Sequence, residues 1–113
     1  MKFPDKAVVV ANNKDELVEL MSFFDDHCMC WPSGSRCSAV VDAIWQNKSV
    51  RDHGEATAIN IAGGMPDGYC WPEYYRRSRL YLSSDPEWNF ISVPDFIGRI
   101  DAVEPSLQIA DLL

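Results

Sequence analysis

Residues 7–27 read AVVVANNKDELVELMSFFDDH, and this stretch decides the fold of the chain. The β-branched run at residues 8–10 predicts a buried strand that ends at Asn12. Asn13 followed by Glu16 is an asparagine form of the capping box, so we expect a helix to begin at Lys14. Its apolar residues recur at the spacing of one helical face: Leu17, Leu20, Met21 and Phe24. A strand followed by a capped helix is therefore the first expected unit.

Further elements follow from the same periodicities. Residues 28–31, 56–62 and 69–71 are expected to be short strands, and residues 37–46 a helix capped by Ser35 or Ser38. Residues 63–68 predict a turn or loop, and residues 72–77 a loop or one helical turn. Residues 79–82 and 88–93 are expected to pair as a hairpin, before a last helix with Pro94 at its first position.

This order predicts one α+β domain over residues 1–113. We expect a small mixed or antiparallel sheet of four to five strands, with two to three helices packed on it.

The composition bounds the function. The chain has 113 residues, with 10 Lys and Arg against 17 Asp and Glu, for a formal net charge of −7. A hydrophobic fraction of 47% argues against disorder along the whole chain. The acidic excess argues against a general nucleic-acid binder, which needs a cationic surface to neutralise phosphates. The sequence has no run of about 18 apolar residues and no signal-peptide core, so we expect a cytoplasmic protein without a membrane span.

The four cysteines, Cys28, Cys30, Cys37 and Cys70, have three readings: two disulfides, a zinc site completed by histidine, or free thiols. Structural zinc sites usually draw two ligand pairs, each two to four residues apart. Here one residue separates Cys28 from Cys30, and no second matched pair occurs. We therefore favour free thiols, and we expect no metal, no cofactor and no catalytic activity, since the sequence carries no nucleophile motif.

The tripeptide Cys-Trp-Pro occurs twice, at residues 30–32 and 70–72, each time with arginine downstream. One interpretation is two aromatic platforms with cationic neighbours that together sequester a nucleotide. The other is two strand ends that bury a tryptophan in the core, and we favour it because buried tryptophan is common in so small a protein. The candidate ligand pocket consists of Trp31, Ser33, Arg36, Trp71, Arg76 and Arg77.

Charge is unevenly distributed along the chain. Acids predominate at both ends, and the only basic cluster is Arg76, Arg77 and Arg79. If the acidic ends lie on one side of the fold, they form a negative surface for a basic partner, and solubility alone is the alternative explanation. The candidate partner-binding residues are Asp25, Asp26, Asp85, Glu87, Trp88, Asp95, Asp101 and Glu104.

Two short motifs give a further indication of the function. Residues 31–34 read Trp-Pro-Ser-Gly after a strand and an Asn/Glu-led helix, and residues 91–96 read Ile-Ser-Val-Pro-Asp-Phe. This order, over residues 7–97, resembles small accessory proteins of tailed phages. The resemblance implies an inhibitor of host defence, including the anti-CRISPR type, acting in the host cytoplasm.

The first functional hypothesis is therefore a non-enzymatic acidic protein, monomeric or homodimeric, that blocks a nucleic-acid-handling host complex. Its carboxylates would stand in for the DNA backbone on a basic protein surface, without binding nucleic acid itself. The second is a small-ligand binder that sequesters a nucleotide through the tryptophan–arginine pocket.

Overall fold

The computed structural model describes residues 3–47, 51–54 and 56–112, with side chains described as far as residue 102. Its strands are β1 (Lys6–Ala11), β2 (Thr57–Ala62), β3 (Met65–Cys70) and β4 (Asn89–Ser92). Its helices are α1 (Lys14–Asp26), α2 (Val41–Gln46), α4 (Pro72–Arg77) and α5 (Val93–Leu112). Three 3-10 turns, η1 (Cys37–Val40), η2 (Arg79–Tyr81) and η3 (Pro86–Trp88), connect them. Within this part of the chain, no helix is both long enough and apolar enough to span a membrane.

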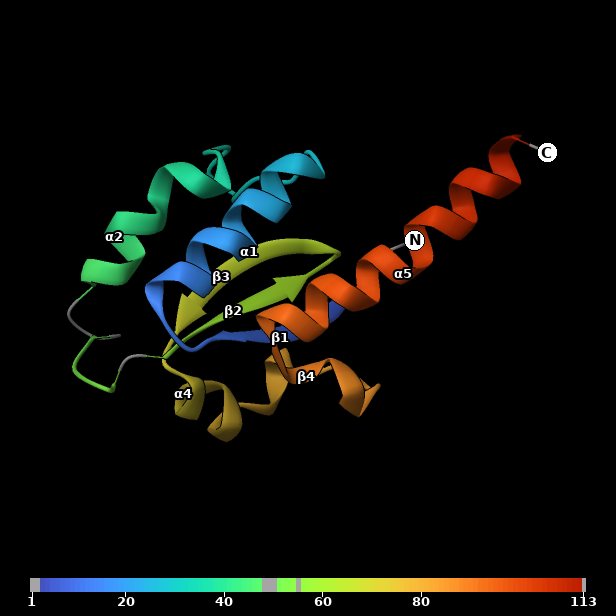
Figure 1. The fold of residues 1–113 in the computed structure, drawn as a ribbon. Coiled ribbons are helices and arrows are strands. Elements are labelled where there is room, and N and C mark those ends of the chain that lie inside the picture. Colours follow the sequence, from blue (N-terminus) through green and yellow to red (C-terminus); the bar gives the residue numbers. More distant parts are fainter. Residues whose placement is uncertain (1–2, 48–50, 55, 113) are drawn as a thin grey trace.

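The strands form one mixed sheet in the order β3-β2-β1-β4. β1 pairs with β2 and β2 with β3 in antiparallel fashion, whereas β4 runs parallel to β1. This arrangement confirms the small α+β fold with a mixed sheet. Helices α1, α2 and α5 lie on one side of the sheet, and α4 lies on the other (Figure 1).

The larger core lies under α1, α2 and α5. Its sheet side comes from every second residue of β1 and β2, such as Val9, Ile59 and Ile61. Its helix side includes the predicted apolar face of α1 together with residues of α2 and α5: Leu17, Leu20, Met21, Phe24, Ile44, Val93, Phe96 and Ile100. Alternation along the strands thus places Val9, Ile59 and Ile61 against the helices, while Val8 and Val10 face the other side of the sheet.

A smaller cluster covers the opposite side of the sheet. Val8 and Ala58 pack there against Tyr75 of α4, whose hydroxyl donates a hydrogen bond to Asn60 Oδ1 at 2.9 Å. Asn60 is 2% exposed, so this bond satisfies a polar side chain that water barely reaches. Gly68 lies opposite Asn60, and a Cβ at residue 68 would approach the Asn60 oxygen to 3.0 Å.

The unit predicted from residues 7–27 is confirmed. α1 begins after Asn13, whose side chain accepts a hydrogen bond from the Glu16 backbone N–H at 2.9 Å. The Glu16 carboxylate in turn accepts from the Asn12 N–H at 3.1 Å. The two bonds close a reciprocal cap, one residue wider than the standard capping box.

The strand predicted at residues 28–31 is wrong. Cys28 takes a left-handed conformation (φ 58°) directly after α1, and the Met29 N–H bonds back to the Phe24 carbonyl at 3.0 Å. This is the Schellman type of helix ending, which reverses the direction of the chain instead of continuing it into a strand. Only an isolated bridge between Cys30 and Arg36 remains, while Met29 and Trp31 contribute to the core.

The turn predicted at residues 63–68 is shorter than expected. Ala62 pairs with Met65, so the β2–β3 hairpin turns on Gly63 and Gly64 alone, and both have positive φ. Two positive φ angles are what a type I′ hairpin turn requires, and glycine adopts them without steric cost. Pro66 therefore lies within β3, where it is tolerated because β3 is an edge strand.

The hairpin predicted from residues 79–82 and 88–93 is also wrong. Residues 79–81 form the turn η2, and the chain crosses beneath the sheet before β4 joins β1 in parallel. The register between β1 and β4 shifts at Phe90, an extra residue with φ 60°. β4 itself, predicted within residues 88–93, is confirmed, and the last helix begins one residue before Pro94.

Candidate partner-binding surface

Four carboxylates border two cavities where η3, β4 and α5 meet, and Trp88 lines one of these cavities. Asp85 and Asp5 border one cavity beside Trp88, and Glu87 and Asp95 border another along the free edge of β4. We call Asp5, Asp85, Glu87 and Asp95 the acidic surface. All four residues are exposed. Three of them were predicted from the sequence, and the fold adds Asp5 from the opposite end of the chain.

Local hydrogen bonds hold the segment before η3 in place. The Asp85 side chain caps η3 by accepting from the Glu87 N–H at 3.0 Å. Asn89 clamps the loop from the other end, because its side chain accepts from the Ser83 N–H at 2.8 Å and donates to the Ser83 carbonyl at 3.0 Å. The carboxylates are thus presented from an ordered backbone, which lowers the entropic cost of binding.

Arg99 is the one cation among residues 85–102, and it is engaged internally. Its guanidinium forms an ion pair with Glu87 and lies 4.7 Å from the centroid of the Trp88 ring. Trp88 is half-buried and packs edge-on against Phe96 at 5.9 Å. Arg99 therefore holds two side chains of this surface in place: Trp88 through a cation–π contact and Glu87 through an ion pair.

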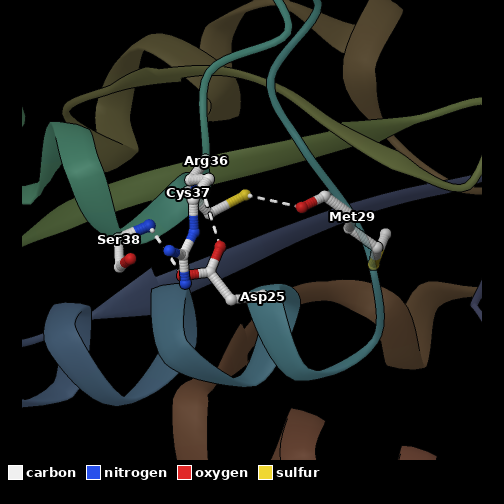
Figure 2. A network of polar contacts seen from close by, with 5 residues as sticks. All are labelled: Asp25, Met29, Arg36, Cys37 and Ser38. Carbon is white, nitrogen blue, oxygen red and sulfur yellow. Dashed lines mark hydrogen bonds and ion pairs between the residues drawn. The ribbon is translucent and has the colours of Figure 1, made fainter.

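Asp25 was predicted as a partner-binding residue, but the structure uses its carboxylate inside the fold (Figure 2). Its two oxygens accept from the Cys37 and Ser38 N–H groups at 2.9 and 3.3 Å. Arg36 lies 3.8 Å away, and the Asp25 side chain is 12% exposed. Asp25 therefore caps η1 from another element, in place of the predicted Ser35 or Ser38.

The thiol of Cys37 lies in the same network. Its Sγ donates to the Met29 carbonyl at 3.6 Å, as Figure 2 shows. Burial, followed by the charges of Asp25 and Cys30, raises the pKa of Cys37 to about 12. A thiol in this state stays protonated at neutral pH, so it is a poor nucleophile and a poor metal ligand.

The other predicted acidic residues lie apart from the acidic surface. Asp26 is exposed at the end of α1 and lines neither of the two cavities of the acidic surface. Asp101 is exposed on α5 but follows Asp95 by six residues, which at 100° per residue turns it to a different face. Glu104 belongs to α5, and its side chain lies outside the described residues.

The residues of the predicted ligand pocket do not come together. Trp31 is 8% exposed and packs edge-on against Tyr69 at 6.3 Å, beside a cavity of about 380 Å³ that Ser33 also lines. Its indole Nε1 has no hydrogen-bond partner among the described residues. Arg36 is turned towards Asp25. Trp31 therefore serves mainly as a core residue.

Trp71 directly follows the last residue of β3 and stacks on His53, with the ring centroids 3.9 Å apart. Arg76 pairs with Glu73 at 2.8 Å and lies 4.8 Å from the centroid of the Phe90 ring, whereas Arg77 is exposed. The two Cys-Trp-Pro copies thus have different environments, and the repeated tripeptide does not form a single site.

Two features of the exposed surface had no clear sequence signal. Asp5 joins the acidic surface only because β1 and β4 are neighbours, a pairing between distant segments. Leu80 was expected to lie in a strand and is instead 78% exposed. Comparisons with protein-family models, with curated proteins and with solved structures found no match.

Proposed function

We propose that this chain is a non-enzymatic binding protein whose acidic surface engages a basic surface on another protein. The observation that carries the proposal is the group of four exposed carboxylates that border the two cavities at η3, β4 and α5, one of them lined by Trp88. The cations beside them, Arg99 and Lys6, are engaged with Glu87 and with the Leu80 carbonyl. Half-buried tryptophan next to charge is a frequent anchor of protein interfaces.

The chemistry favours a partner that normally binds phosphate. Carboxylates held on a rigid backbone offer a basic surface the same charge as a DNA backbone. Such a partner is held mainly by electrostatic complementarity, which raises the association rate and gives strong salt dependence. The resemblance to phage accessory proteins adds a narrower form of the proposal, in which the partner is a host defence complex of the CRISPR type.

Affinity purification from a bacterial extract, followed by mass spectrometry, tests the proposal. We expect the captured protein to be a nucleic-acid-binding one that is released by added duplex DNA and by high salt. Substituting Asp5→Asn, Asp85→Asn, Glu87→Gln and Asp95→Asn together removes four charges while preserving side-chain shape. At about 0.5 kcal/mol for each exposed charge pair, affinity for that protein should fall about thirtyfold.

A matched control removes four exposed carboxylates elsewhere: Asp15, Glu19, Asp42 and Asp52. The control should retain the captured protein, apart from a small effect of net charge. Equal loss in both variants, or capture that duplex DNA does not affect, would refute the proposal.

A further inference from the structure

The segment from α4 to η2 carries a second exposed surface of opposite charge. It consists of Tyr74 and Arg77 of α4 with Arg79 and Leu80 of η2, and we call it the basic–apolar surface. Tyr74 contacts Tyr81 of η2, with ring centroids 6.1 Å apart, so the two short elements lie side by side. Arg77 follows Tyr74 by three residues and therefore projects from a neighbouring position on the helix.

The charges of this surface are unusual for so acidic a chain. Lys14, Arg36, Arg76 and Arg99 each lie within ion-pair distance of a carboxylate. Arg77 and Arg79 are exposed and have no such partner among the described residues. With 17 acidic residues in the chain, two neighbouring arginines without a carboxylate form a local positive site for an external group.

Leu80, the residue after Arg79, adds an exposed apolar side chain to this surface. It is 78% exposed, against 44% for Val18, 40% for Tyr74 and 38% for Met65, the other exposed large hydrophobic residues described. Its backbone is nevertheless anchored, because Lys6 Nζ donates to the Leu80 carbonyl at 3.1 Å. A leucine held out in solvent by an anchored turn is a feature that partner binding would explain.

The aromatic side chains beneath keep this surface rigid. Tyr74 packs edge-on against Tyr75 at 5.4 Å, and Tyr75 packs edge-on against Tyr81 at 5.1 Å. The hydrogen bond from Tyr75 to Asn60 ties the group to the sheet. Binding would therefore immobilise few additional side chains.

We propose that the basic–apolar surface binds an acidic polypeptide segment that carries an apolar side chain. Acidic side chains would pair with Arg77 and Arg79, and the apolar side chain would cover Leu80 beside Tyr74. Arginine and tyrosine are enriched at the energetic centres of protein interfaces. The protein would then have two contact surfaces of opposite charge, and this inference is independent of the proposed function.

Other polyanions fit this surface less well. A phosphate backbone is held by several cations, and an anionic membrane by clusters of four to eight, against a protein whose net charge of −7 repels both. Neither a phosphate backbone nor an isolated headgroup uses an exposed leucine. A polypeptide segment satisfies two arginines and one leucine at once.

Fluorescence polarisation of the full chain with a labelled twelve-residue peptide of Glu, Asp and Leu tests the inference. We expect saturable binding that weakens at least about fivefold for Arg77→Ala with Arg79→Ala, the size expected of two exposed charge pairs. Leu80→Ser should weaken binding at least about threefold, and a peptide with serine in place of leucine should behave likewise. Circular dichroism of each variant checks that the fold is retained.

Matched controls separate this surface from general charge. Arg36→Ala with Arg51→Ala removes the same charge elsewhere, and Val18→Ser removes an exposed apolar residue of α1; both should bind within twofold of the unaltered chain. Neutralising the acidic surface should leave peptide binding unchanged or tighter. Equal weakening in the controls would overturn the inference. So would tighter binding of oligothymidylate or of phosphatidylcholine–phosphatidylserine vesicles than of the peptide.

Discussion

Replacing Asp25 by alanine should destabilise the fold by about 2–3 kcal/mol. The substitution removes the acceptor of two backbone N–H groups, those of Cys37 and Ser38. Cys37 is fully buried, so its N–H would lose a charged acceptor and gain no water, at a cost of about 2 kcal/mol. Ser38 is exposed and its N–H can be hydrated, so we assign it about 0.5 kcal/mol. The pair with the exposed Arg36 adds little.

This loss is a large part of the total, because a chain of 113 residues is expected to have about 6–17 kcal/mol of stability. Urea unfolding followed by circular dichroism measures it. With a slope of about 1.5 kcal/mol per molar urea, the midpoint should fall by about 1.5 M. Asp25→Asn keeps one acceptor oxygen and should lie between the alanine variant and the unaltered chain.

Asp26→Ala is the matched control, since Asp26 is the exposed neighbour at the end of α1. The free energy of unfolding of this variant should differ from that of the unaltered chain by no more than about 0.5 kcal/mol. If the Asp25 and Asp26 variants unfold at the same urea concentration, the cap on η1 does not stabilise the fold as argued.

Three further outcomes are expected. Tyr75→Phe leaves the buried Asn60 oxygen without its donor and should cost about 1–2 kcal/mol in urea unfolding. Cys28→Gly should raise the melting temperature by about 2–5 °C, because glycine adopts φ 58° without strain, whereas Cys30→Gly should lower it. The pKa of Cys37, about 12, lies above its unfolded value, so its contribution is complete below about pH 8.5 and is lost as pH rises towards 12. Between pH 9 and 10 the unaltered chain should therefore lose about 1 kcal/mol more stability than Cys37→Ala, and equal slopes would contradict this.

The sequence predicts the fold best where one segment contains all the determinants. The β1–α1 unit follows from β-branched residues, helical spacing and a cap within residues 7–27. The failures are segments whose structure depends on distant partners. The predicted strand at residues 28–31 gives way to a helix ending that carries Met29 and Trp31 into the core. Asp25 caps η1 from twelve residues away, so serines close to η1 were the wrong candidates.

Sequence information on the site has the same limit. Acidic residues at the chain ends and the cluster Arg76–Arg79 are visible in the sequence, but their partners are not. Arg99 engages Glu87 only because α5 packs over η3. The apolar side chain of Leu80 favours a strand in the sequence, yet in the structure η2 exposes this side chain to solvent. Charge can be counted along a chain, whereas pairing and exposure depend on tertiary structure.

The two outer strands have a consequence for behaviour at high concentration. A sheet with free edges invites strands of other molecules to add, which is a common route to aggregation. Here one edge contains Pro66, which has no N–H to donate, and the other is four residues long and interrupted at Phe90. Neither edge offers an incoming strand an unbroken row of hydrogen-bonding groups. A proline in one edge strand and a bulge in the other therefore help this small protein to remain a separate molecule in a crowded solution.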